Sequence, residues 1–200
     1  MSNGKGPVKF NISNAHYALL TRDATTGAIS YGTPVAVPGS RSISLDVEGD
    51  QEVFWADGIK YFIDNSNQGY TGNWELAYIL DQMRKEILQE VQDTAGVLFE
   101  VQEADDPVEF AFGFQVDGNR YDTRFWFYCC TASRPGMEAN TNEGSRTPQT
   151  DTLSLTMVGA TVKSGDSRNF VRAKCLSTAT GDTYDDWFDA VVLPGTFSTT

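Results

Sequence analysis

Acidic side chains alternate along one short segment of the chain. They are Asp46, Glu48, Asp50 and Glu52. In an extended strand, this spacing places all the carboxylates on one face. Like charges along one face repel each other, but such a row would suit a surface that must repel a polyanion, for example a ring through which DNA passes. A solvated strand face in an acidic protein is the alternative interpretation.

Residues that could support catalysis are few. The only histidine is His16, which lies in a strand-like segment without a nucleophile motif to meet it, and we interpret it as structural. No glycine-rich phosphate loop occurs in the sequence. Acid pairs such as Asp185 and Asp186 are expected in a chain with 27 acidic residues. The sequence therefore predicts no catalytic residue and no enzyme.

Metal-binding patterns are also weak. The cysteines and the histidine lack zinc-site spacing. A segment that begins at Asp64 resembles a calcium loop, with Gly69 at its sixth position and Glu75 at its twelfth. However, its intermediate positions Ser66 and Gln68 are uncharged, and the residues before it are typical of a strand. We predict neither a metal nor a cofactor, and calcium enters only through the alternative function given below.

Composition is typical of a folded, non-catalytic protein. The chain has 200 residues, of which 40% are hydrophobic and 12% aromatic, so we expect one domain over residues 1–200. A net charge of -12, a pI near 4.4 and scattered basic residues disfavour specific nucleic-acid binding. No apolar stretch is long enough for a signal peptide or a membrane span, which predicts a cytosolic product without a membrane partner. Cys129, Cys130 and Cys175 are predicted to be buried thiols.

The elements that must position these residues are mostly strands. Short β-rich segments separated by Gly, Asn, Asp and Pro recur along the chain. Residues 110–116 and 121–130 are predicted to form a central hairpin with its aromatic side chains toward the core. Helical spacing of apolar residues occurs over 80–91, and a second short helix is predicted over 184–190. This pattern predicts a mainly β fold, an antiparallel β-sandwich, with one flanking α-helix and long loops.

Two segments are not typical of a core. Residues 134–150 have few apolar side chains and many turn formers, which predicts a long exposed loop. Residues 57–72 mix aromatic side chains with Asn, Gln and Gly, a composition typical of a contact surface. The candidate contact residues in and beside this segment are Trp55, Tyr61, Phe62 and Tyr70. Burial of these aromatics in their own chain is the alternative.

Three segments carry a resemblance to a known family. They begin with NAHYALL (residues 14–77), TASRPGMEANT (residues 131–156) and YDDWFDAVV (residues 184–192). From about Phe10 to Val192 the chain resembles, in order and spacing, the major tail tube protein of long, non-contractile-tailed bacteriophages (siphophages) of Gram-positive hosts. The resemblance implies a β-sandwich or barrel-like tail tube fold and hexameric rings stacked into a hollow tube. The lumen would hold the tape-measure protein and conduct DNA during ejection.

The resemblance also gives the residues expected places. The candidate lumen-lining acids become Asp46, Glu48, Asp50, Glu52 and Glu75, past which viral DNA would move without specific binding. Residues 57–72 become the candidate hairpin or loop that reaches a neighbouring subunit or ring, and residues 134–150 could serve the same contacts. The implied partners are further copies of the chain, the tape-measure protein, and the tail tip and tail terminator proteins. The implied location is the virion tail, assembled in the host bacterial cytoplasm.

A function of another class fits the residues without the resemblance. A monomeric carbohydrate- or receptor-binding β-sandwich would use Tyr70, Trp74 and the segment from Asp64, with calcium as an aid. Such a module would stay monomeric, whereas a tube protein must self-associate.

Overall fold

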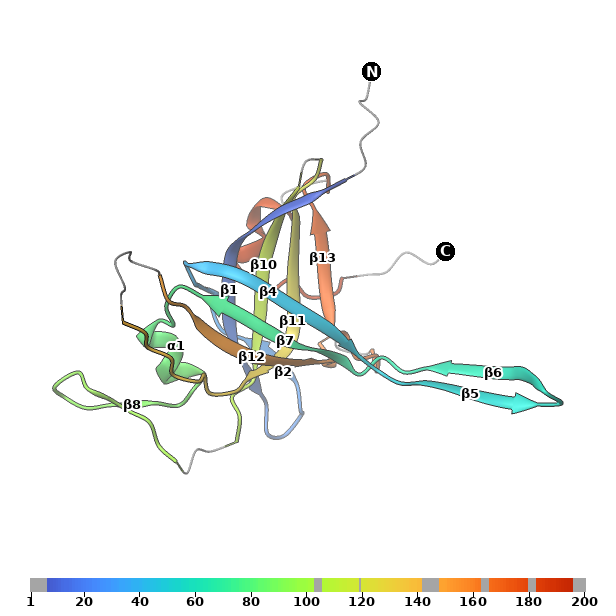
Figure 1. Ribbon diagram of the computed structural model, residues 1–200, viewed down its shortest axis with the longest axis horizontal. Helices are drawn as coiled ribbons and strands as arrows, with labels where there is room; N and C mark the ends of the chain where they lie inside the picture. The colour runs from blue at the N-terminus through green and yellow to red at the C-terminus, as the bar shows by residue number, and fades with distance from the viewer. Residues whose placement is uncertain are drawn as a thin grey trace, which may run out of the picture.

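Strands dominate the computed structural model, which describes residues 7–102, 106–118, 120–141, 148–162, 166–179 and 183–195 (Figure 1). The strands are β1 (Lys9–Arg22), β2 (Ile29–Tyr31), β3 (Val35–Ala36), β4 (Ser40–Glu48), β5 (Gln51–Ala56), β6 (Ile59–Asn65), β7 (Gly69–Leu76), β8 (Val91–Gln92), β9 (Leu98–Phe99), β10 (Phe110–Gly118), β11 (Thr123–Ala132), β12 (Asp151–Val158) and β13 (Arg172–Leu176). The helices are α1 (Asp81–Glu86) and the 3-10 helix η1 (Asp185–Phe188). The predicted mainly β fold with one α-helix is confirmed.

The main sheet is antiparallel and divides into two layers. Its strand order is β2-β1-β10-β11-β12-β7-β4, with β13 paired to β11 and β3 paired to β1. Strand β11 joins the layers, because its residues 123–127 pair with β13 and its residues 129–132 pair with β12. Strands β4, β7 and β12 run across the view of Figure 1, whereas β10, β11 and β13 run up it. We call β4, β7 and β12 the front layer and β1, β10, β11 and β13 the central layer.

Hydrophobic clusters cover both faces of the central layer. Because side chains alternate along β11, Phe125 and Phe127 enter the cluster between the two layers, while Trp126 enters the cluster on the other side. The C-terminal segment covers this second cluster, and the indole Nε1 of Trp126 donates a hydrogen bond to the carbonyl of Trp187 in η1 at 2.9 Å. The front layer, in contrast, contributes one face to the core: Leu153, Leu155 and Met157 are buried, and the residues between them are exposed.

The cysteines are buried and free, as predicted. Cys130 belongs to the cluster between the layers and Cys129 to the cluster beneath the C-terminal segment. Burial raises the pKa of the Cys129 thiol to about 11. These thiols are therefore packing groups and are protonated at neutral pH.

Helix α1 is shorter than the apolar spacing over 80–91 predicts. It spans Asp81–Glu86, and the left-handed φ of 59° at Gln89 prevents its continuation. Ile87 and Leu88 still pack into the core from the following turn. The hydroxyl of Tyr17 donates a hydrogen bond to Glu86 at 2.7 Å and so fixes the helix to β1. Neither helix of the described residues has the length and apolar character needed to cross a membrane.

Candidate interaction surfaces

The front layer presents a polar face to solvent. Strand β12 alternates strictly between buried and exposed residues, and the register with β7 and β4 places polar side chains beside each other across the layer. We call this set the polar face; it comprises Ser42, Ser44, Asp46, Glu48, Thr71, Asn73, Glu75, Thr152, Ser154 and Thr156. All these side chains are hydroxyls, amides or carboxylates, and none is a cation. The surface is therefore hydrophilic and negative.

The acidic row is divided between two structural elements. Asp46 and Glu48 lie on β4 and belong to the polar face, opposite Thr71 and Gly69 of β7. Strand β4 ends at Glu48, and the next strand, which contains Glu52, pairs in a separate two-stranded sheet. The alternating acids therefore do not share one strand face, contrary to the expectation from their spacing.

A close backbone approach causes this division. A Cβ atom added at Gly49 would lie 2.0 Å from the carbonyl oxygen of Ser66, so glycine permits the two chains to meet there. The backbone N–H of Asp50 donates to the hydroxyl of Ser66 at 2.8 Å, while the carbonyl of Asp50 accepts from the backbone N–H of Ser66 at 3.0 Å. A new register begins at Gln51, opposite Asn65, and it places Glu52 opposite Asp64.

Glu75 is the most strongly held acid of the polar face. Its carboxylate accepts hydrogen bonds from the hydroxyls of Thr150 at 2.6 Å and Ser42 at 2.8 Å, and it forms an ion pair with Arg41. These interactions, led by the hydrogen bond from Thr150, lower the pKa of Glu75. Glu75 is therefore ionised at neutral pH, but the cation of Arg41 offsets part of its negative charge.

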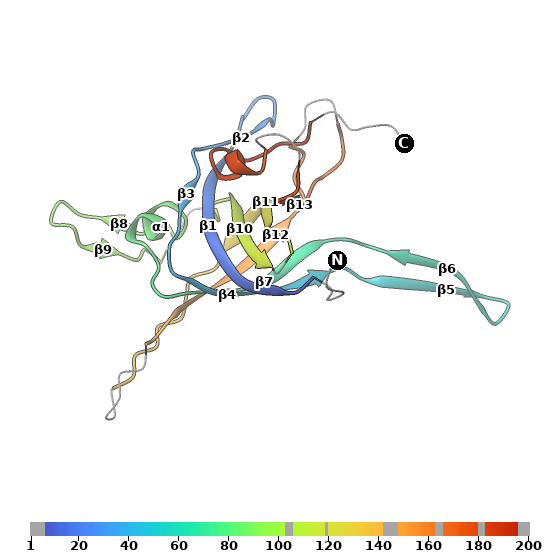
Figure 2. The ribbon, with the colours of Figure 1, turned by 90° about the horizontal axis from the view of Figure 1, so that it is seen from above.

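Strands β5 and β6 form a two-stranded arm that projects away from both layers (Figures 1 and 2). The arm ends in the two-residue turn Asp57–Gly58, whose φ angles of 52° and 77° are those of a type I′ hairpin turn. An Asp-Gly pair is the preferred sequence for this turn. The exposed large hydrophobic residues of the arm are Phe54, Trp55, Ile59, Tyr61, Phe62 and Ile63.

Both faces of the arm are apolar. Phe54 stands opposite Phe62, and at the adjacent position Val53 stands opposite Ile63 on the other face. The exposed fractions of Trp55 and Tyr61 are 58% and 70%. A two-stranded hairpin is marginally stable alone in water, and this arm packs neither face against a third strand or a helix of the described chain. The arm therefore has the chemistry of a binding element for other molecules.

The predicted contact segment 57–72 crosses the boundary between the arm and the front layer. Trp55, Tyr61 and Phe62 are exposed on the arm, whereas Tyr70 lies on β7 and is half-buried. The ring of Tyr70 packs edge-on against Phe127, with centroids 5.5 Å apart. Tyr70 therefore packs within its own chain, which was the alternative interpretation for these aromatic residues.

The predicted list of contact residues omits other exposed residues of the arm. They are Phe54, Ile59 and Ile63. The signal for them was present, since residues 53–55 and 61–63 are runs of apolar side chains that break the alternation of a half-buried strand.

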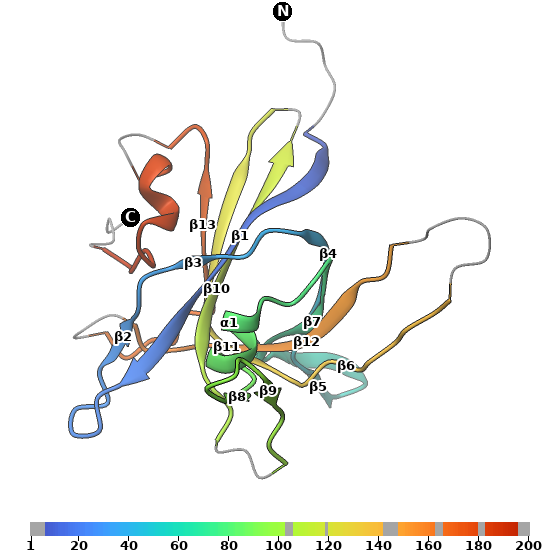
Figure 3. The ribbon, with the colours of Figure 1, turned by 90° about the vertical axis from the view of Figure 1, so that its left-hand side faces the viewer.

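A second exposed apolar region lies on the opposite side of the body from the arm in Figure 2, near β8 and β9, which lie beside α1 (Figure 3). Val91 of β8 and Phe99 of β9 are exposed there. Met137, which is completely exposed, lines a nearby pocket together with Glu90 and Glu100. Arg134, which follows β11, forms an ion pair with Glu100, which follows β9, with 2.8 Å between Nη1 and Oε1. In the predicted loop 134–150, residues 134–141 and 148–150 lie largely at the surface, and residues 142–147 lie outside the described part of the chain.

The other residues considered for catalysis, ligand binding or metal binding pack within the fold or lie far apart. The ring of His16 stacks on Phe188, with centroids 4.4 Å apart, its Nδ1 lies 2.9 Å from the carbonyl oxygen of Asn14, and burial lowers its pKa. Trp74, a residue of the alternative binding site, is fully buried, and its indole N–H donates to Ser40 at 3.1 Å. Asp64 lies on the arm, away from Glu75 on the polar face, and no group of three or more His, Cys, Asp or Glu side chains in the described ranges is placed to hold a metal ion.

Comparison with known proteins adds no relationship to this geometry. No protein-family model matches the chain, and no curated protein matches it either.

Proposed function

We propose that this chain is a non-enzymatic virion protein that assembles as stacked hexameric rings into the hollow tail tube of a siphophage. The tube surrounds the tape-measure protein and conducts DNA during ejection. The observation that carries the proposal is the exposed arm, apolar on both faces and joined directly to a layer with a polar, acidic outer face. The family resemblance of the sequence supplies the identity of the assembly.

The arm supports self-association. Burying one large exposed side chain such as Trp55 or Tyr61 contributes about 1.5–3 kcal/mol, so the aromatic residues of the arm can together offset the entropic cost of docking. Because both faces are apolar, one arm can be enclosed between two neighbouring molecules, for example one in its own ring and one in the next. A contact between an arm and a different surface repeats from copy to copy and generates rings or stacks.

The front layer supports the conduit. Strand β4 ends the order of the main sheet and pairs along one side with β7, so among the described strands its other edge is available for pairing with a neighbouring copy. Pairing of this kind could close the front layers of several copies into a barrel. The polar face would then line the lumen, where Asp46 and Glu48 repel the phosphates of passing DNA.

The other partners follow from this role. The tape-measure protein would occupy the lumen during assembly, and the tail tip and tail terminator proteins would bind the two ends of the tube. The protein would act in the virion tail after assembly in the host bacterial cytoplasm. This function requires neither a cofactor nor a membrane.

Negative-stain electron microscopy of the purified protein over a concentration series, with light scattering alongside, tests the proposal. We expect six-fold rings or hollow tubes, either spontaneously or after addition of tail tip and tape-measure proteins. The double variant Trp55→Ser, Tyr61→Ser should remain a folded monomer, whereas the control Leu193→Ser, at an exposed position outside the arm, should assemble normally. A wild-type chain that stays monomeric in the presence of the tail tip proteins would contradict the proposal.

A further inference from the structure

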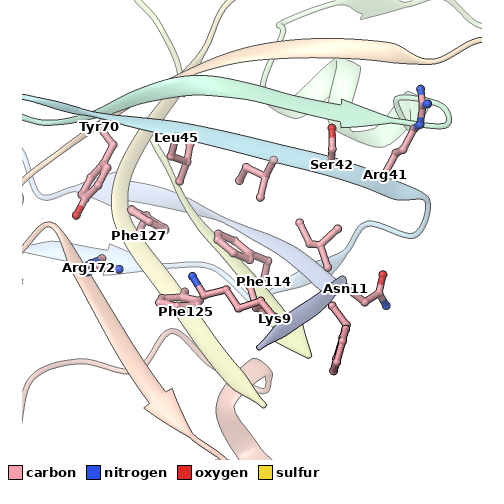
Figure 4. A pocket seen from close by; sticks show the side chains of 14 residues that line it. Lys9, Asn11, Arg41, Ser42, Leu45, Tyr70, Phe114, Phe125, Phe127 and Arg172 are labelled. Carbon is pink, nitrogen blue, oxygen red and sulfur yellow. The ribbon is translucent and has the colours of Figure 1, made fainter. Parts of the chain in front are cut away.

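An apolar pocket opens between the front layer and the central layer (Figure 4). Its volume is about 530 Å³. Side chains from both layers line it, including Leu45 of β4, Phe114 of β10, and Phe125 and Phe127 of β11. These residues belong to the main hydrophobic cluster or pack against it, so the floor of the pocket is an edge of the core.

Cations surround this pocket although the chain is strongly acidic. Lys9, Arg41 and Arg172 line it, and no Asp or Glu does. Arg41 is paired with Glu75, but neither Lys9 nor Arg172 has an ion-pair partner among the described residues. The guanidinium of Arg172 lies 5.7 Å from the ring centroids of both Tyr70 and Phe125, so positive charge stands directly beside the apolar floor. The pocket therefore suits an occupant that combines aromatic and carboxylate groups.

One face of the arm presents this combination. Glu52 stands opposite Asp64, and two residues farther along the arm Phe54 stands opposite Phe62 on the same face. Two residues of a strand span about 7 Å. The carboxylate pair and the aromatic pair are thus adjacent, as are the cations and the aromatic floor of the pocket. Glu52 and Asp64 also repel each other across the arm, and two cations would relieve this repulsion.

We propose that the arm of one copy docks into this pocket of a neighbouring copy. Phe54 and Phe62 enter the apolar floor, while Glu52 and Asp64 meet Lys9 and Arg172. This assignment rests on the proposed self-assembly and names the surface that receives the arm. The arm points away from its own body in Figures 1 and 2, so the contact joins two molecules. Each copy would donate one arm and receive another, which is the arrangement that closes into a ring or continues as a stack.

Charge reversal tests the docking. The variant Lys9→Glu, Arg172→Glu should raise the protein concentration needed for assembly at least about tenfold, because four acids would then meet at the contact. The variant Glu52→Lys, Asp64→Lys should do the same, and the combination of all four changes should return the threshold to within about threefold of wild type. Lys174→Glu, an exposed reversal on the same strand as Arg172 but outside the pocket, is the matched control. Circular dichroism and thermal melting confirm that each variant is folded.

Photo-crosslinking separates this proposal from the broader one. A photoreactive phenylalanine at position 62 of the full chain should crosslink to β1, β10 or β11 of another copy, identified by mixing isotope-labelled and unlabelled protein. Crosslinks between copies at another surface, for example near β8 and β9, overturn the docking but leave self-assembly intact. Crosslinks of the arm to the tape-measure protein, or a pocket filled by a free amphiphilic anion in the assembled tube, also overturn the docking. A chain that yields no crosslink between copies and forms no rings or tubes, even with tail tip proteins, overturns both proposals.

Discussion

The arm continues two strands of the front layer, β4 and β7, yet the arm and the layer distribute apolar side chains in opposite ways. In the front layer, β7 buries Trp74 and Leu76 and turns Asn73 and Glu75 toward the polar face. In the arm, the consecutive residues 53–55 are all apolar and lie on both faces. Strict alternation means that a strand has one apolar partner, its own core. Loss of alternation on an exposed ribbon is the pattern expected of a strand pair that binds other molecules, as we propose for the arm.

Substitution of a tryptophan in the front layer and of one in the arm should give the largest difference in stability between the two regions. Trp74 is fully buried between Ser40 and Phe112, so Trp74→Ala should lower the free energy of unfolding by about 3–5 kcal/mol. Trp55→Ala removes the same side chain from the exposed arm and should change the stability of the monomer by less than about 0.5 kcal/mol. Urea denaturation of both variants measures the difference. Equal losses would mean that the arm is packed against its own body in solution.

Substitution of two glycines should give a smaller difference, in which the loss of stability is again greater in the front layer than in the arm. At Gly69, where β7 begins, φ is 113° and an added Cβ would lie 2.0 Å from the carbonyl oxygen of Met157, so Gly69→Ala should destabilise the protein by about 3 kcal/mol. At Gly58, in the turn of the arm, φ is 77° and no atom lies within 4 Å of an added Cβ. Gly58→Ala should therefore cost about 1 kcal/mol, confined to the arm. Global unfolding would report the first loss, and amide hydrogen exchange of the arm would report the second.

The sequence predicts which segments form strands better than it predicts where a pair of strands leaves the main sheet to form the arm. The aromatic hairpin of β10 and β11, the buried thiols and the mainly β fold follow from local pattern and composition, which the structure confirms. The division of the acidic row at Gly49 depends on an approach to Ser66, distant in sequence, and no local pattern reports such a contact. The boundary between Tyr70 and the arm was missed for the same reason, because burial of Tyr70 depends on Phe127 from another strand.

The acids now fall into two groups that can be tested separately. Asp46→Asn with Glu48→Gln neutralises the polar face and should leave stability within about 0.5 kcal/mol, while it slows DNA ejection from assembled tails. Lys at both positions should slow ejection further, since phosphates would then be attracted. The pair Asp50→Asn with Glu52→Gln neutralises the two acids that follow Gly49, toward the arm. It should raise the protein concentration needed for assembly, but tubes that do form should eject DNA at the normal rate. Unchanged ejection kinetics with both polar-face variants would show that these acids do not face the DNA.

Glu75 should give the smallest and most specific effect. Its pKa is lowered by the hydrogen bonds from Thr150 and Ser42 and by Arg41, so the ionised form is favoured in the folded state. The resulting stabilisation is present above the unfolded-state pKa of about 4.3 and is lost as the pH falls through the lowered folded-state pKa. Glu75→Gln should therefore flatten the acidic limb of a plot of melting temperature against pH, and Thr150→Val, which removes the leading hydrogen bond, should flatten it partly. An acidic limb that both variants leave unchanged would mean that other carboxylates control the acid lability, and that Glu75 contributes to the polar face through its position alone.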